Sequence, residues 1–169
     1  MALTTARATQ KRLDRSADMK YRVPMAASTT LYKGALVCLN ASGYAVPGST
    51  ATTLTALGVL GDQSFGLSLD RVVNSGSAGD VKVDIEGGTF GFDGTGGDLP
   101  TIADIGKVVY ITDDETVCKT GTGKSIAGTL VEISVDAVTG LTQYFVAIGV
   151  TPMGLTGGVG PTGPTGPTG

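Results

Sequence analysis

Histidine and tryptophan are absent from this 169-residue sequence, and cysteine occurs only twice. Without histidine, the chain has no Ser-His-Asp or Cys-His catalytic arrangement and no zinc site that uses an imidazole ligand. Two separated cysteines, Cys38 and Cys118, are too few for a structural zinc site and do not make a disulfide framework. Their apolar, strand-like surroundings favour buried free thiols over a disulfide bridge. The sequence therefore predicts a non-enzymatic protein without a metal or cofactor.

Long apolar runs are also missing from the sequence. No run of about 18 apolar residues occurs, so we expect no transmembrane helix and no membrane partner. The N-terminus is polar and basic and has no apolar h-region, so we expect no secretory signal and folding in a cytoplasm. Charged residues make up only 16% of the chain, which indicates a surface that a partner covers in part.

Glycine is abundant, at 27 residues, whereas aromatic residues make up 5%. Together with frequent Thr, Val and Ala, this composition favours many short strands joined by tight turns. Alternation of apolar and polar residues at 81–85 and 109–111 predicts strands with one buried face. We therefore expect residues 21–150 to form one all-β domain, a compact sandwich or small barrel. The expected strands are 21–25, 30–40, 44–46, 53–60, 80–86, 89–93, 107–112, 116–119, 126–135 and 141–150.

Two segments resemble parts of known binding loops. The segment Gly121-Thr-Gly-Lys-Ser125 shares its end with a phosphate-binding loop, which needs a glycine five residues before its last glycine. With Gly123 as the last glycine, that position holds Cys118, and an expected strand follows in place of a helix. We interpret the segment as a Gly-rich hairpin turn. The acidic run at 113–115 lacks the spacing of a calcium loop, so we expect a solvated acidic turn.

The first 22 residues are basic, with six Lys or Arg against two Asp, whereas the remaining chain has six basic residues against thirteen acidic ones. We expect residues 1–20 to be an extended or partly helical arm that orders on an acidic partner; the alternative is a solvated tail. Exposed ion pairs contribute little affinity, so leucines of the arm should share the contact. The candidate contact residues are Leu3, Arg7, Lys11, Arg12, Leu13 and Arg15.

Residues 151–169 have a glycine at every third position from 154 onward and end in a strict Gly-Pro-Thr repeat. Only glycine fits at the crowded axis of a triple helix, and proline pre-sets the required φ. The period predicts the start of a collagen-like fibre; the alternative is a flexible linker. So short a segment would not trimerise alone, which predicts a trimeric β body. The expected triple-helix residues are Gly154, Gly157, Gly160, Pro161, Gly163, Pro164, Gly166, Pro167 and Gly169.

Between residues 20 and 150, the chain carries a series of strand-and-turn patterns at 33–39 (KGALVCL), 43–46, 58–61, 79–87, 89–90, 105–110 and 125–131. In these patterns it resembles the head decoration, or cement, proteins of tailed phages. The resemblance implies a β domain that trimerises on the outer capsid surface near three-fold or quasi-three-fold positions. There it would bridge subunits of the major capsid protein and become part of the virion. The collagen-like tail departs from the compact family pattern and indicates a decoration protein that bears a fibre.

Two other functions compete with this interpretation. A tail or host-binding fibre component would share the trimer and the collagen-like segment, but it would contact the host surface. A nucleic-acid-binding module would use the basic arm, although the acidic body opposes it and the arm has no aromatic residue before Tyr21 on which a base could stack.

Overall fold

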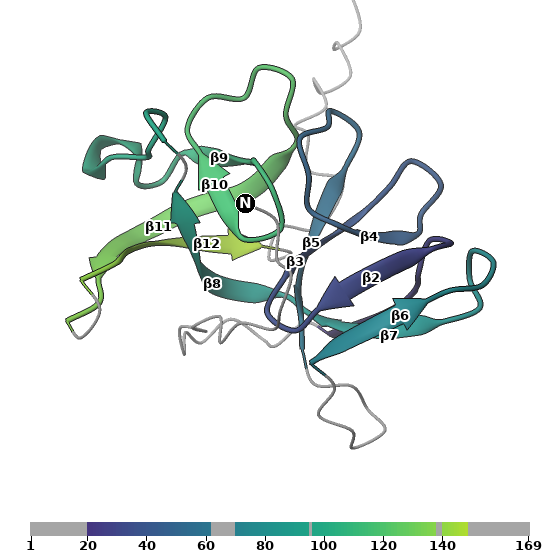
Figure 1. The fold of residues 1–169 in the computed structure, drawn as a ribbon. Helices are drawn as coiled ribbons and strands as arrows, with labels where there is room; N and C mark the ends of the chain where they lie inside the picture. The colour runs from purple at the N-terminus through teal and green to yellow at the C-terminus, as the bar shows by residue number, and fades with distance from the viewer. Residues whose placement is uncertain (1–19, 62–69, 95, 138–139, 149–169) are drawn as a thin grey trace, which may run out of the picture.

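The computed structural model describes residues 20–61, 70–94, 96–137 and 140–148 (Figure 1). These residues form twelve β-strands and one short 3₁₀ helix, and no α-helix occurs among them. The strands make a five-stranded sheet, a closed five-stranded barrel and a two-stranded sheet. The all-β class and the small barrel are therefore confirmed.

The first half of the chain builds the two open sheets. All neighbouring strands in both sheets are antiparallel. The five-stranded sheet has the order β1 (Lys20–Pro24), β7 (Lys82–Glu86), β5 (Thr55–Leu60), β3 (Leu36–Leu39) and β4 (Ala45–Pro47), and the second sheet pairs β2 (Thr29–Tyr32) with β6 (Arg71–Asn74).

The second half of the chain closes into the barrel. Its strands follow the order β10 (Thr116–Cys118), β8 (Gly88–Gly94), β12 (Thr142–Ile148), β11 (Ile126–Val135) and β9 (Val108–Ile111), and β9 pairs with β10 to close the ring. The 3₁₀ helix η1 (Ile102–Asp104) lies in the connection between β8 and β9.

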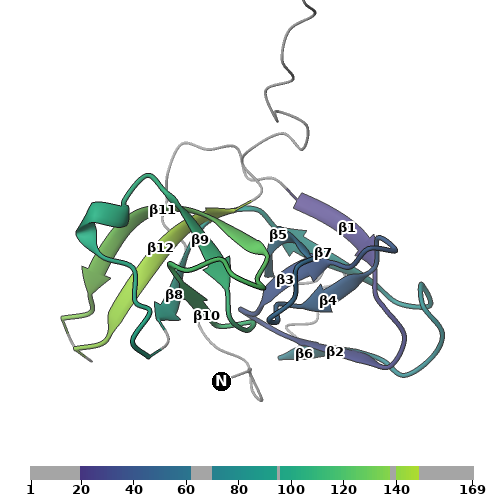
Figure 2. The ribbon, with the colours of Figure 1, turned by 90° about the horizontal axis from the view of Figure 1, so that it is seen from above.

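The central part of the five-stranded sheet is covered on both faces, with the barrel against β3 and β5 on one side and the β2–β6 pair on the other (Figure 2). Successive side chains of a strand point to opposite faces. On β3, Leu36 and Cys38 therefore join the core that fills the barrel, whereas Val37 and Leu39 join the core beneath β2 and β6. Burial on both faces explains why this strand is an uninterrupted apolar run.

The expected strands were wrong in two places. The segment 30–40 is two strands, because the chain turns at Gly34, which has φ +82°, and the N–H of Ala35 bonds to the carbonyl of Tyr32 at 3.0 Å. Strand β6 was not expected, since a charged residue and short length hide its pattern. Its last residue, Asn74, is buried and donates to the carbonyls of Ala26 and Ser77, both at 2.9 Å.

Candidate interaction surface

The loop from Gly121 to Ser125 connects β10 to β11 and makes a tight turn. The backbone N–H of Lys124 donates to the carbonyl of Gly121 at 3.0 Å, and Gly123 adopts φ +71°. We had expected a hairpin turn here, and that expectation was wrong. Strand β9 lies between β10 and β11 in the barrel, so the two strands joined by this loop do not pair with each other. A strand follows the loop, so the helix that a phosphate-binding loop requires is replaced by β11.

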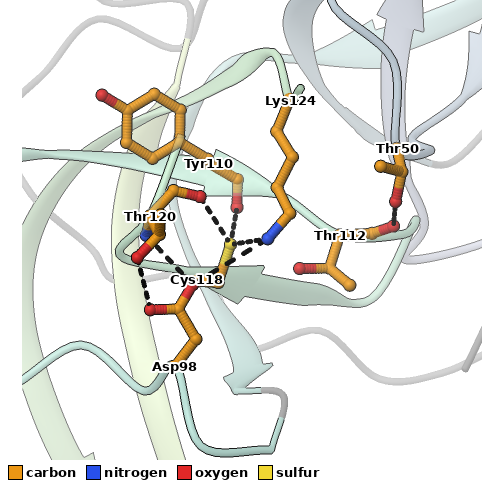
Figure 3. A network of polar contacts seen from close by, with 7 residues as sticks. All are labelled: Thr50, Asp98, Tyr110, Thr112, Cys118, Thr120 and Lys124. Atoms are coloured by element: carbon orange, nitrogen blue, oxygen red, sulfur yellow. Dashed lines mark hydrogen bonds and ion pairs between the residues drawn. The ribbon is translucent and has the colours of Figure 1, made fainter. Parts of the chain in front are cut away.

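The side chain of Lys124 points toward the end of β10 and the β8–β9 connection (Figure 3). Its Nζ lies 3.0 Å from Sγ of Cys118 and 3.9 Å from a carboxylate oxygen of Asp98. Asp98 also accepts hydrogen bonds from the Oγ1 and backbone N–H of Thr120, at 2.7 and 3.1 Å. The hydroxyl of Thr120 is the main reason that the pKa of Asp98 lies below its ordinary value, and the charge of Lys124 adds to it. These contacts give the lysine a structural role.

Ser125 fastens the β4–β5 loop to the barrel. Its Oγ donates to the carbonyl of Ala51 at 2.6 Å and accepts from the N–H of Leu54 at 2.9 Å. Nearby, the Oγ1 of Thr50 donates to the carbonyl of Thr112 at 2.9 Å. Lys124 and Ser125, the two polar residues that made the segment resemble a nucleotide site, therefore connect parts of the fold.

The acidic run at 113–115 is not a solvated turn, which corrects our expectation. Asp114 is 3% exposed, and its backbone carbonyl accepts from the N–H of Leu36 at 2.8 Å. The N–H of Glu115 donates to the carboxylate of Asp113 at 3.0 Å. Asp114 is buried and its two neighbours are partly buried, because the run links the barrel to β3. Within the described residues, no group of three or more His, Cys, Asp or Glu side chains could hold a metal ion.

The two cysteines are buried and free, as expected. Burial, assisted by the charge of Asp114, raises the pKa of Cys38 to about 12. A thiol with this pKa is almost entirely protonated at neutral pH and is a poor nucleophile. Cys38 therefore serves as a small apolar residue of the barrel core.

The surface of the barrel carries a group of exposed apolar side chains that we call the apolar face. Ile102 is the most exposed of them, at 80%. Monomeric proteins rarely expose large contiguous apolar areas, so such a group is a candidate contact surface. The apolar face consists of Ile102 on η1, Ile105 after it, Val108 on β9, and Ile126 and Val131 on β11.

Strand register brings these residues together. Val108 pairs with Thr129 and Tyr110 pairs with Ile126, so β9 and the first part of β11 present one continuous outer face. The segment that follows η1 joins the same face, since the N–H of Gly106 donates to the carbonyl of Leu130 at 2.8 Å. The alternate residues of both strands, including Val109 and Leu130, fill the barrel.

A polar clamp fixes the turn that presents Ile102 and Ile105. The carboxylate of Asp104 accepts from the N–H of Thr101 at 2.9 Å, from its Oγ1 at 2.8 Å and from the Nζ of Lys107 at 3.2 Å. The bonds from Thr101 contribute most to lowering the pKa of Asp104 to about 2. A preorganised turn loses little conformational entropy when it binds, which suits a contact surface.

The residues selected from the sequence as a contact arm and as a triple helix, at 3–15 and 154–169, lie outside the described residues. The apolar face was missed, because its members are scattered over thirty positions and alternate with core residues. No helix in the described part of the chain has the length and apolar character to cross a membrane. Comparison with known proteins finds no matching family model, no curated relative and no similar solved structure.

Proposed function

We propose that this chain is a structural virion protein, a trimeric decoration or cement protein that binds the outer surface of a phage head. Its β-rich body would bridge and stabilise neighbouring subunits of the major capsid protein. The tail would project away from the head as a collagen-like fibre. The protein would be synthesised in the host cytoplasm and would catalyse no reaction.

The observation that carries this proposal is the glycine period, which begins at Gly154, six residues after β12 ends at Ile148. A triple helix needs three chains in register, so the period supports a trimeric body. The exposed apolar face supports a role in protein–protein contact. The basic arm adds a second means of contact, with an acidic surface.

The same glycine period favours a host-binding fibre component as a second candidate. The two functions differ in which end of the molecule is anchored. A decoration protein binds the head through its body and residues 1–20, whereas a host-binding fibre would bind cells and leave heads bare. A nucleic-acid-binding module is a third candidate, supported by the basic arm alone.

Co-sedimentation with heads tests the proposal directly. The full-length chain is mixed with heads assembled from the major capsid protein of the phage that encodes it, and we expect saturable binding in multiples of three copies. Deletion of residues 1–19, which precede β1, should leave a folded trimer in light scattering but weaken head binding about tenfold or more, because several weak contacts act together. Absence of binding by the full-length chain would refute the decoration function, and a salt-dependent shift of DNA would favour the third candidate.

A pair of matched variants tests whether head binding depends on the charges of the arm or only on the total charge of the protein. Replacing Lys11 and Arg12 of the arm by glutamine should weaken head binding. The same change at Lys82 and Lys119, two exposed lysines of the body, removes equal charge and should leave binding nearly unchanged. Equal losses in both variants would overturn the assignment of the arm.

A further inference from the structure

We infer that the apolar face is the surface through which three copies of this chain contact one another. The inference rests on the proposed trimer and deepens it by assigning the contact to particular residues. Its occupant is a second copy of the chain, meeting the side of the barrel formed by η1, β9 and the first part of β11.

The place where the chain leaves the barrel is the first argument. Strand β12 ends at Ile148, and the residue before it, Ala147, pairs with Thr129 of β11. Thr129 pairs in turn with Val108 of the apolar face. Neighbouring strands are about 4.8 Å apart, so the exit lies roughly 10 Å from Val108.

The length of the connection is the second argument. The glycine period begins at Gly154, and six residues after Ile148 span at most roughly 20 Å. When three chains wind together, each barrel must therefore hold its exit within about that distance of the common axis. The side of the barrel next to the exit then faces the other two copies, and this side carries Val108 and Ile126.

The chemistry of the surroundings is the third argument. Among the described residues from 88 to 148, eight are acidic and three are basic, a net charge of −5. Three such barrels repel one another, so apolar contact must provide the attraction. The face offers it with five aliphatic side chains that lose unfavourable exposure to water when they are covered.

Matched substitutions of exposed residues test the inference in the full-length chain. Ile102→Glu and Val108→Glu introduce a carboxylate at the apolar face. Leu141→Glu changes a residue of similar exposure at the opposite end of β12, and Val73→Glu changes a strand valine that is 47% exposed, against 43% for Val108. Circular dichroism would check that each variant is folded, and Ile102, which is 80% exposed, can be replaced without a change in the core.

Sedimentation velocity over a range of protein concentrations gives the readout. Each variant of the apolar face should raise the concentration at which the trimer half-dissociates by about tenfold or more, since the change occurs in all three copies, whereas both controls should match the wild type. Because the attraction is apolar between acidic bodies, added salt should not dissociate the wild-type trimer.

The possible failures are distinguishable. A wild-type chain that sediments as a monomer would overturn the proposed trimer and this inference with it. If the wild-type chain is a trimer, and the Ile102→Glu and Val108→Glu variants half-dissociate at the same protein concentration as the two controls, the inference is overturned but the proposed trimer is not. If those variants stay trimeric but no longer bind heads, the apolar face meets the capsid and the assignment to a second copy is wrong.

Discussion

The two halves of the molecule bury their cores equally well but present very different surfaces. Nine large apolar side chains are exposed among the described residues, and eight of them lie in the barrel half, from 88 to 148. The sheet half, from 20 to 86, exposes only Val73. Its described residues include five basic and four acidic side chains, whereas the barrel half has a net charge of −5.

The two halves differ in where they place their apolar side chains. The sheet half hides its apolar residues between the barrel and the β2–β6 pair, so a water-exposed polar surface remains. The barrel half fills its interior and still leaves isoleucines outside, held there by the Asp104 clamp. The proposed contact between chains would therefore use the barrel half.

The strongest test of the comparison removes one large core side chain from each half. Phe92→Ala in the barrel should lower the free energy of unfolding by about 3–5 kcal/mol, and Leu60→Ala in the sheet half by about 2–5 kcal/mol, because both side chains are fully buried. Denaturant unfolding followed by circular dichroism measures both losses. Each variant should keep a single transition, since β3 and β5 belong to both cores. Two separate transitions would mean that the halves fold independently.

A smaller effect is expected from the buried polar residues that hold loops. Asn74→Ala should cost about 2–3 kcal/mol, because it leaves the carbonyls of Ala26 and Ser77 without their donor. Ser125→Ala, at the junction of the two halves, should cost about 1–2 kcal/mol. The same unfolding assay measures both, with the exposed Ser42→Ala as the control. Losses no larger than that of the control would show that these bonds do not stabilise the fold.

The smallest effect is a pH dependence at the clamp. The pKa of Asp104 is lowered from 3.8 to about 2 in the folded protein, so its carboxylate stabilises the fold fully above about pH 4. This stabilisation is lost as the pH falls through about 2. Asp104→Asn should therefore be less stable than the wild type at pH 7, and the difference should vanish near pH 2.

Denaturant titrations at pH 7, 4 and 2 measure this difference. Asp70→Asn, at an exposed aspartate of the sheet half, is the control and should change stability less at pH 7. A difference between wild type and Asp104→Asn that is unchanged down to pH 2 would exclude the clamp as its origin.

Sequence patterns predicted the elements whose signals are local. Alternation identified β7 and β9, and turn chemistry identified the β3–β4 hairpin, where the side chain of Asn40 accepts from the N–H groups of Ser42 and Tyr44, both at 3.0 Å. The turn at Gly34 was missed, since it interrupts an otherwise continuous apolar run.

Features that depend on tertiary structure could not be predicted in this way. The burial of Asp114 follows from its position between the barrel and β3, which no spacing in the sequence reveals. The apolar face needs the pairing of β9 with β11 before Val108 and Ile126 become neighbours. The arm and the tail were identified by composition and period, and as contact surfaces they remain predictions.

The alternation of β3 between two cores has a consequence for how the chain finds its fold. A slip of β3 by one residue would turn Leu36 and Cys38 toward the β2–β6 pair and Val37 toward the barrel, so it would disturb both cores at once. The register of β3 is therefore fixed by packing on both faces of the sheet. A β3 strand paired one residue out of place would bury neither core fully, so the native register is favoured over its neighbours.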